Sequence, residues 1–239
     1  MTEKLYLTDS YTKVFDAKVT AISQDTIELD RTAFFPTGGG QLCDTGTLIS
    51  YNQKSYRVKE VKKQGDSVLH ILENAEGLGV GSLVKGTIDW DRRYALMRLH
   101  TALHVMDAVV VKKHSNGQIT GGQIYEHKAR IDFDMEGLSK ETVEQIIAET
   151  QKIVDEGHPV IVRNLSKEEA AKVPGLARTA PGAELLKRLE VVRVVDIGTI
   201  DFQLDGGTHV ANTKEIGKIK LIGYENKGSK RKRIEIALE

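Results

Sequence analysis

Several kinds of residue are scarce in this sequence, and each scarcity excludes a class of protein. The 239 residues include one cysteine and 4 prolines, which excludes a disulfide framework and a collagen-like chain. No apolar run approaches the ~18 residues of a membrane-spanning helix. The first residues show no basic region followed by an apolar block, so we expect no signal peptide. These features predict a cytoplasmic globular protein in a reducing compartment.

Net charge is also absent, since 34 Lys+Arg balance 34 Asp+Glu. A nucleic-acid partner would therefore have to meet a local basic patch. Aromatic residues make up 5% of the chain, so the composition does not indicate a stacking platform for bases.

The hydrophobic pattern changes near residue 90, and this predicts an α+β protein of two domains. Residues 1–90 contain short β-type runs separated by turn residues, which favours a small antiparallel barrel or sandwich. From Asp91 the apolar residues recur at steps of three and four, which is typical of an amphipathic helix. Further helices are predicted from Ser139 to Gly157 and after Ser166, where Glu169 completes a capping box. The β pattern returns after residue 190, so we expect a β domain at 1–90 and an α+β domain at 91–239.

The first motif that carries chemistry is His100-Thr-Ala-Leu-His104. Side chains four apart on a helix lie on one face, so both imidazoles could bind one metal ion. The alternative is two histidines with ordinary surface or core roles. Thr101 stands where a zincin protease would have its glutamate, which argues against that class.

The second motif is Asp205-Gly-Gly-Thr-His209, which follows a β run. Its carboxylate and imidazole could converge on a cation, because glycine allows the chain to bend around it. A plain turn between strands is the alternative. Together the two motifs offer three imidazoles and a carboxylate, a donor set that zinc accepts. Asp205 could be a ligand, bind loosely or act as a base, and the sequence does not choose between these.

Four ordered segments resemble one known family. They are the block FFPTGGGQLCDTG, the motif LHTALH, the segment TGGQIYEHKARIDFD, and DGGTH with the residues that follow it. The chain resembles the editing domain of alanyl-tRNA synthetase and its free-standing relatives, the alanyl-tRNA editing proteins of the AlaX type, in their medium-length form. The resemblance implies an N-terminal β-barrel, an α+β editing domain and a trans-editing hydrolase of the cytoplasm. Its substrate would be Ser-tRNA(Ala) and, in some members, Gly-tRNA(Ala).

The resemblance implies one Zn²⁺ held by His100, His104, Asp205 and His209. The family usually has Cys where this chain has Asp205. A carboxylate is a harder donor than a thiolate, so we expect weaker retention of zinc and greater tolerance of other divalent metals. Cys43 is predicted to be a small apolar residue of the barrel rather than a ligand.

The resemblance also implies roles for residues in the substrate pocket. Thr120 is similar to the family's specificity threonine, whose hydroxyl could bond the serine side chain, and Gln123 falls at a family pocket position. A threonine of a β-turn is the alternative for Thr120. The glycine-rich block Gly38, Gly39, Gly40 and Gln41 is predicted to form a turn at the barrel.

The expected partner is the acceptor end of tRNA(Ala), with no membrane or DNA. Basic residues at the end of the first helix and before the last strand are the predicted contacts: Lys112, Lys113, Lys227, Lys230, Arg231, Lys232 and Arg233. A charge run can also be a solvated turn. Two other functions remain open, a small-molecule metallohydrolase and a non-catalytic module that binds tRNA or a synthetase.

Overall fold

The computed structural model describes residues 2–113, 118–135, 138–227 and 231–239. The chain forms two compact units, Met1–Leu96 and Met97–Glu239. Within the described residues, no helix is long and apolar enough to cross a membrane. The α+β class predicted from the sequence is confirmed.

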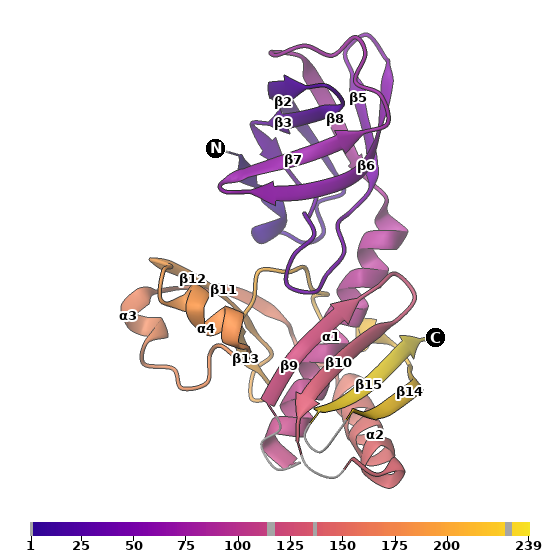
Figure 1. Ribbon diagram of the computed structural model, residues 1–239, viewed down its shortest axis with the longest axis vertical. Helices are drawn as coiled ribbons and strands as arrows, with labels where there is room; N and C mark the ends of the chain where they lie inside the picture. The colour runs from indigo at the N-terminus through magenta and orange to yellow at the C-terminus, as the bar shows by residue number, and fades with distance from the viewer. Residues whose placement is uncertain (1, 114–117, 136–137, 228–230) are drawn as a thin grey trace. The chain divides into compact units, whose positions relative to one another are not determined.

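The first unit is built around a closed antiparallel barrel with the strand order β2-β3-β7-β6-β5-β8 (Figure 1). Its strands are β2 (Val14–Ser23), β3 (Thr26–Leu29), β5 (Gly46–Ser50), β6 (Ser55–Gln64), β7 (Ser67–Leu72) and β8 (Leu83–Ile88). Beside it, β1 (Glu3–Lys4) pairs in parallel with β4 (Arg31–Thr32), and η1 (Leu5–Leu7) is a short 3-10 helix.

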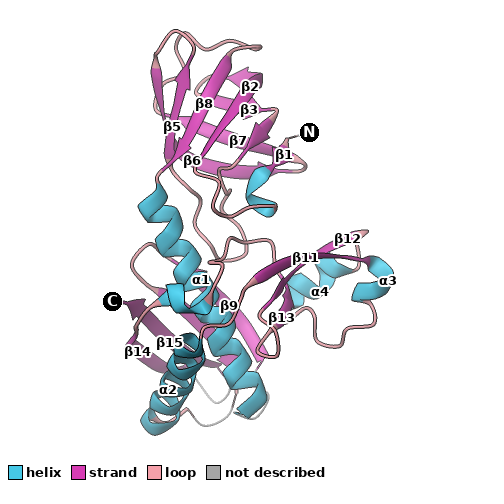
Figure 2. Ribbon diagram, turned by 180° about the vertical axis from the view of Figure 1, so that it is seen from behind, coloured by secondary structure: helices cyan, strands magenta, loops and turns pink. Residues whose placement is uncertain are grey.

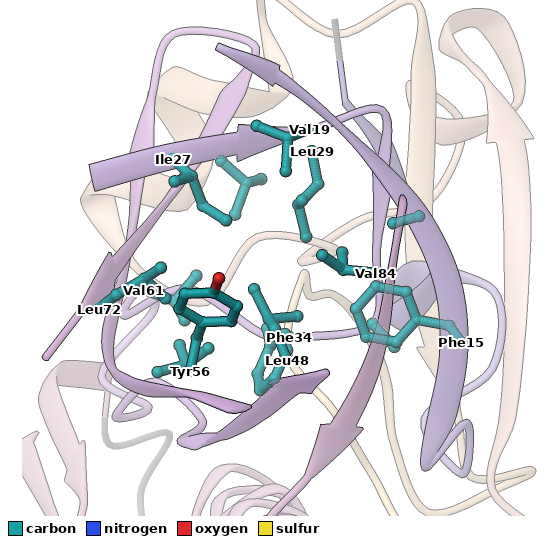
Figure 3. Packing of buried hydrophobic residues seen from close by; sticks show 14 of the residues in the cluster. Phe15, Val19, Ile27, Leu29, Phe34, Leu48, Tyr56, Val61, Leu72 and Val84 are labelled. Atoms are coloured by element: carbon teal, nitrogen blue, oxygen red, sulfur yellow. The ribbon is translucent and has the colours of Figure 1, made fainter. Parts of the chain in front are cut away.

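Alternation along the barrel strands turns every second side chain inward, as in the buried–exposed pattern of β8. Figure 3 shows side chains from different strands, including Ile27, Leu48 and Val84, meeting inside the barrel. Cys43 belongs to this buried cluster, as the sequence predicted.

The division between the units falls inside α1 (Trp90–Lys113), whereas the sequence placed it at 90/91, before the helix. The first turn of α1 belongs with the barrel because Arg93 is fully buried there against Asp44. The Arg93 guanidinium also donates to Ser10 O at 2.8 Å and to Ala33 O at 2.6 Å.

In the second unit, α1 is the central element rather than an amphipathic surface helix. Between Leu96 and Val110 only Arg98 is partly exposed, so the predicted polar face does not meet solvent. Partners far along the chain cover it: Arg98 donates to Ile216 O at 2.6 Å, and Asp107 accepts from Gln203 Nε2 at 2.7 Å.

An antiparallel four-stranded sheet, in the order β14-β15-β10-β9, forms one part of this unit (Figure 1). Its strands are β9 (Gln118–Ile124), β10 (Ala129–Asp134), β14 (Ile219–Lys227) and β15 (Arg231–Leu238). Helix α2 (Lys140–Glu156) packs along β14 and the 3-10 helix η2 (Thr213–Ile216), and Figure 2 shows it beside that edge of the sheet. Ser139 caps its start and Gly157 its end, as predicted.

The other part is a three-stranded antiparallel sheet, β11-β12-β13, with two short helices (Figure 2). These elements are β11 (Ile161–Ser166), α3 (Lys167–Ala170), α4 (Ala180–Leu186), β12 (Val191–Asp196) and β13 (Phe202–Leu204). The capping box predicted at Ser166 and Glu169 is present at α3. Val192 and Val194 form a small separate hydrophobic core with Ala170 and Leu176.

Candidate metal centre

Two histidines of α1 and two residues of the segment after β13 meet at one point. His100, His104, Asp205 and His209 each offer a ligand atom, and these atoms lie within 4.8 Å of one another. The ring centroids of His100 and His209 are 4.3 Å apart, and those of His104 and His209 are 4.8 Å apart. The structure thus joins the two motifs that the sequence singled out.

The Nε2 atoms of the three imidazoles face the Asp205 carboxylate. His209 Nε2 lies 2.9 Å from Oδ2, while His100 Nε2 and His104 Nε2 lie 3.6 Å and 3.9 Å from Oδ1. Gly207 N donates to Asp205 Oδ2 at 2.6 Å, which fixes the orientation of the carboxylate.

Thr101 determines which nitrogen of His209 carries the proton. Its hydroxyl donates to Met97 O at 2.9 Å, so its oxygen accepts from His209 Nδ1 at 3.1 Å and from Val210 N at 3.3 Å. In the neutral imidazole, Nε2 then has a lone pair aimed at the carboxylate. A proton or a metal ion can bridge two such acceptors, and with His100 and His104 beside them these residues fit a bound metal ion.

Burial favours the neutral form, which a metal requires, in two of the three imidazoles. It lowers the pKa of His209 to about 4 and the pKa of His100 well below its ordinary value. Burial also acts on His104, but the Asp201 carboxylate bonded to its Nδ1 outweighs this effect and raises its pKa. Burial alone would raise the pKa of Asp205; the adjacent imidazoles outweigh it and hold that pKa well below its usual range.

The chain approaches itself closely at Gly207. A Cβ atom at this position would lie 2.3 Å from His100 Cε1, so any larger residue would push the Asp205 segment away from α1. The glycine predicted to permit a bend therefore also permits contact between the two ligand-bearing segments.

The predicted pocket residues lie in β9. Thr120 is exposed and is the extra residue of a β-bulge, since Ile119 and Gly121 pair with the adjacent residues Phe133 and Asp132. Bulges re-aim side chains beside active sites. Gln123 is partly buried and pairs across the sheet with Arg130. The substrate roles of Thr120 and Gln123 stay predictions.

The predicted basic contacts differ in what they offer a phosphate. Lys112 Nζ donates to Thr199 O at 2.5 Å and to Ile200 O at 2.7 Å, and Lys113 pairs with Glu149. Lys232 is buried on the core side of β15, which removes it from the predicted basic surface.

The remaining residues of this basic run are less uniform. Arg233 is held by Asp132 through bonds of 2.6 and 2.9 Å. Arg231 is exposed at the start of β15. Lys227 ends β14, and Lys230 lies outside the described residues.

The glycine-rich block forms a tight turn in the barrel unit, as predicted. Gly38 N donates to Gln41 O at 3.1 Å and Gln41 N to Gly38 O at 2.9 Å. Positive φ angles of 59° at Gly39 and 84° at Gly40 give a type I′ turn, which favours glycine. Gln41 is fully buried.

Sequence reasoning missed Asp201 and the role of Thr101. Asp201 Oδ2 accepts from His104 Nδ1 at 2.9 Å. A carboxylate behind a metal-binding histidine is a common arrangement, but the sequence offers only a short Asp-containing turn as a signal.

Comparison with known proteins identifies relatives that match along the chain. Residues 4–92 match the family described as tRNA synthetases class II (A), and residues 192–235 match the threonyl and alanyl tRNA synthetase second additional domain. The alanyl-tRNA editing protein AlaX-M of Saccharolobus solfataricus is 42% identical over 235 residues, which is 98% of each chain. AlaX-M of Methanosarcina acetivorans is 38% identical over 100% of this chain and 99% of its own.

A longer relative matches through one part only. An alanine–tRNA ligase of Saccharolobus islandicus is 36% identical over 94% of this chain, and the match spans 25% of the ligase. Since relatives above a third identity match along nearly the whole chain, the protein belongs to the family of alanyl-tRNA editing proteins of the AlaX-M type.

Proposed function

We propose that this protein is a metal-dependent aminoacyl-tRNA deacylase that hydrolyses Ser-tRNA(Ala), and also Gly-tRNA(Ala), while sparing Ala-tRNA(Ala). The observation that carries the proposal is the convergence of His100, His104, Asp205 and His209 on one point, in a chain similar throughout to AlaX-M proteins. A pocket that selects alanine rejects smaller glycine and hydroxyl-bearing serine poorly, so a second site is needed to remove these errors.

The four residues would hold Zn²⁺ or another divalent ion, and Asp205 replaces the thiolate usual in the family. Such an ion polarises an ester carbonyl or lowers the pKa of a bound water toward ~7. Thr101 and Asp201 keep the protons on the outer nitrogens of His209 and His104, so that both Nε2 atoms stay available as ligands. The buried surroundings of His209 and His100 favour their neutral, ligating form.

Discrimination between serine and alanine is assigned to Thr120. A hydroxyl that bonds the serine side chain separates substrates by up to ~10⁴-fold, whereas a difference of one methylene gives ~10–200-fold. Because Thr120 is the extra residue of a bulge, its side chain does not follow the regular alternation of side chains between the two faces of β9. Gln123, two positions beyond the paired glycine Gly121, would add a polar contact to the substrate.

The acceptor end of tRNA(Ala) is the proposed partner. Of the predicted basic residues, Arg231 is exposed at the start of β15, whereas Lys112 is bonded to the carbonyls of Thr199 and Ile200. Phosphate contacts of this kind weaken as salt rises.

A deacylation time course on Ser-tRNA(Ala), Gly-tRNA(Ala) and Ala-tRNA(Ala), at low and high salt, tests the proposal. We expect loss of the serine and glycine esters only, and slower loss at high salt. His104→Ala should abolish hydrolysis, with exposed His127→Ala as its matched control. Thr120→Val should lose selectivity between serine and alanine while keeping its metal, with Thr87→Val on the barrel as control.

Three outcomes would replace the proposal by another function. Equal rates on all three esters would indicate a general hydrolase, and activity on small esters that ignores salt would indicate a small-molecule metallohydrolase. A chain that binds tRNA(Ala), holds no metal and leaves every ester intact would be a binding module.

A further inference from the structure

A buried polar chain leads away from the metal centre through the outer nitrogen of His104. His104 Nδ1 donates to Asp201 Oδ2 at 2.9 Å, and Asp201 is 3% exposed. Gln203 Nε2 donates to the same carboxylate at 2.9 Å and to Asp107 Oδ2 at 2.7 Å. Asp201 thus joins a helix-borne ligand to the sheet strand β13.

One arginine serves both buried carboxylates. Arg178, from the segment between α3 and α4, places Nη2 3.5 Å from Asp201 Oδ1 and Nη1 3.7 Å from Asp107 Oδ2. Leu204 N donates to Leu176 O at 2.8 Å, which fixes the segment that carries the arginine. An unpaired carboxylate would be costly at this depth, and the guanidinium offsets that cost.

The turn that presents Asp201 is fastened to the end of α1. Lys112 Nζ donates to the carbonyls of Thr199 and Ile200, the two residues before Asp201. Ile197 N donates to Asp201 O at 2.8 Å and closes the turn from the other side. Lys112 therefore acts on the geometry of Asp201, although the sequence favoured it as a tRNA contact.

We propose that Asp201 is a positioning residue of the metal centre, held by Arg178, Gln203 and the Lys112 clamp, and that it sets the affinity for metal through His104. This inference rests on the proposed metal-dependent function. The carboxylate keeps the His104 proton on Nδ1, points Nε2 at Asp205 and makes the imidazole a better donor. Asp201 acts through the outer nitrogen of His104, and Lys112 acts through the turn that carries Asp201, so neither is one of the candidate ligands.

Competition for Zn²⁺ between the full-length protein and a chromophoric chelator tests the inference without use of activity. We expect Asp201→Asn to weaken zinc binding about 10- to 100-fold, the usual effect of losing such a partner. Asp196→Asn is the matched control, because Asp196 begins the same turn but bonds Gly198 N and Arg163 rather than a histidine. Lys112→Met should weaken zinc binding by a smaller factor, and Lys113→Met should leave it unchanged.

A second readout uses the metal-free protein, so that failure of the metal site and failure of the inference can be told apart. Nitrogen NMR of neutral His104 should show the proton on Nδ1 in the unsubstituted protein and a loss of that preference in Asp201→Ala. Zinc binding by Asp201→Asn as tight as by the unsubstituted protein would overturn the inference while leaving the proposed function standing. An unsubstituted protein that binds neither zinc nor another divalent ion but keeps the Nδ1 tautomer would overturn the metal-dependent function and, with it, a role for Asp201 in metal affinity.

Discussion

A buried histidine of the barrel unit, which is not one of the candidate metal ligands, is expected to make the stability of that unit depend on pH. His70 is fully buried in β7, and its Nε2 lies 2.8 Å from Thr32 Oγ1. Burial lowers the pKa of His70 to about 4. Because the unfolded chain binds a proton at His70 at higher pH than the folded chain does, acid favours unfolding.

We predict that the barrel unit loses stability as pH falls from the ordinary histidine range toward about 4. The His70 contribution to the free energy of unfolding is fully present above about pH 6.5, and about 2 kcal/mol of it is lost by about pH 5. Urea unfolding of the unsubstituted protein and of His70→Gln, at about pH 7.5 and about pH 5, measures the difference. Equal losses in the two proteins would show that His70 does not cause the effect.

Individual residues also show where sequence reasoning stopped. The meeting of the four candidate ligands could be predicted, because His100 and His104 are spaced for one face of a helix and Asp205 and His209 occupy a glycine-rich turn. The role of Asp201 could not be predicted, because it depends on a turn that returns to α1. The burial of Lys232 could not be predicted either, because it depends on the register of β15 in the sheet.

Among the elements, α1 does most to organise the chain. Its first turn is anchored in the barrel unit by Arg93, which bonds both oxygens of Asp44 and the carbonyls of Ser10 and Ala33. Arg93 and Asp44 have no exposed side-chain surface. A buried pair of this kind is costly to break because its partner is left uncompensated.

We predict that Arg93→Met destabilises the barrel unit by about 3–5 kcal/mol, since it leaves the Asp44 charge buried and unpaired. Arg92→Met is the neighbouring control, because Arg92 is partly exposed and donates to the carbonyl of Cys43 rather than to a buried carboxylate. Denaturant unfolding followed by fluorescence of the single tryptophan, Trp90, provides the measurement. A loss no greater than that in Arg92→Met would contradict the buried-pair account.

The positions of helices and strands were predicted better than the contacts that bury them. Strand alternation, the Ser139 and Gly157 caps and the capping box at Ser166 are local signals, and each has its counterpart in the structure. The all-round burial of α1 is not local, because the groups that cover it come from residues such as Glu149, Gln203 and Ile216. The hydrophobic periodicity therefore located the helix, but it wrongly predicted that the polar face of the helix is exposed to solvent.

At the scale of the whole molecule, the two units should respond differently to removal of metal. The ligands all belong to Met97–Glu239, whereas Trp90 stacks on Tyr94 at 5.6 Å within the first unit. An ion bound only by the folded state stabilises the unit that binds it, by about 4 kcal/mol at a free concentration ~1,000 times Kd.

We predict that a chelator lowers the thermal transition of the second unit and leaves that of the barrel unit in place. Calorimetry should show two unfolding transitions, and Trp90 fluorescence identifies the one that belongs to the barrel unit. The chelator should lower the temperature of the other transition and leave that of the barrel unit unchanged. Asp205→Ala should show no shift on chelation, because it lacks a ligand. Equal shifts of both transitions would mean that the units unfold as one.

The strand order of the barrel has a consequence for synthesis of the chain. β8 lies between β2 and β5, so the barrel closes when residues up to Ile88 have been made, and Arg93 follows within a few residues. His100 and His104 are made next, but Asp205 and His209 come about a hundred residues later. As the chain leaves the ribosome from its N-terminus, the barrel can fold first, because domains generally fold as units. The metal centre then forms only when nearly all of the chain has emerged, so a truncated product would have a complete barrel and no means of holding the ion.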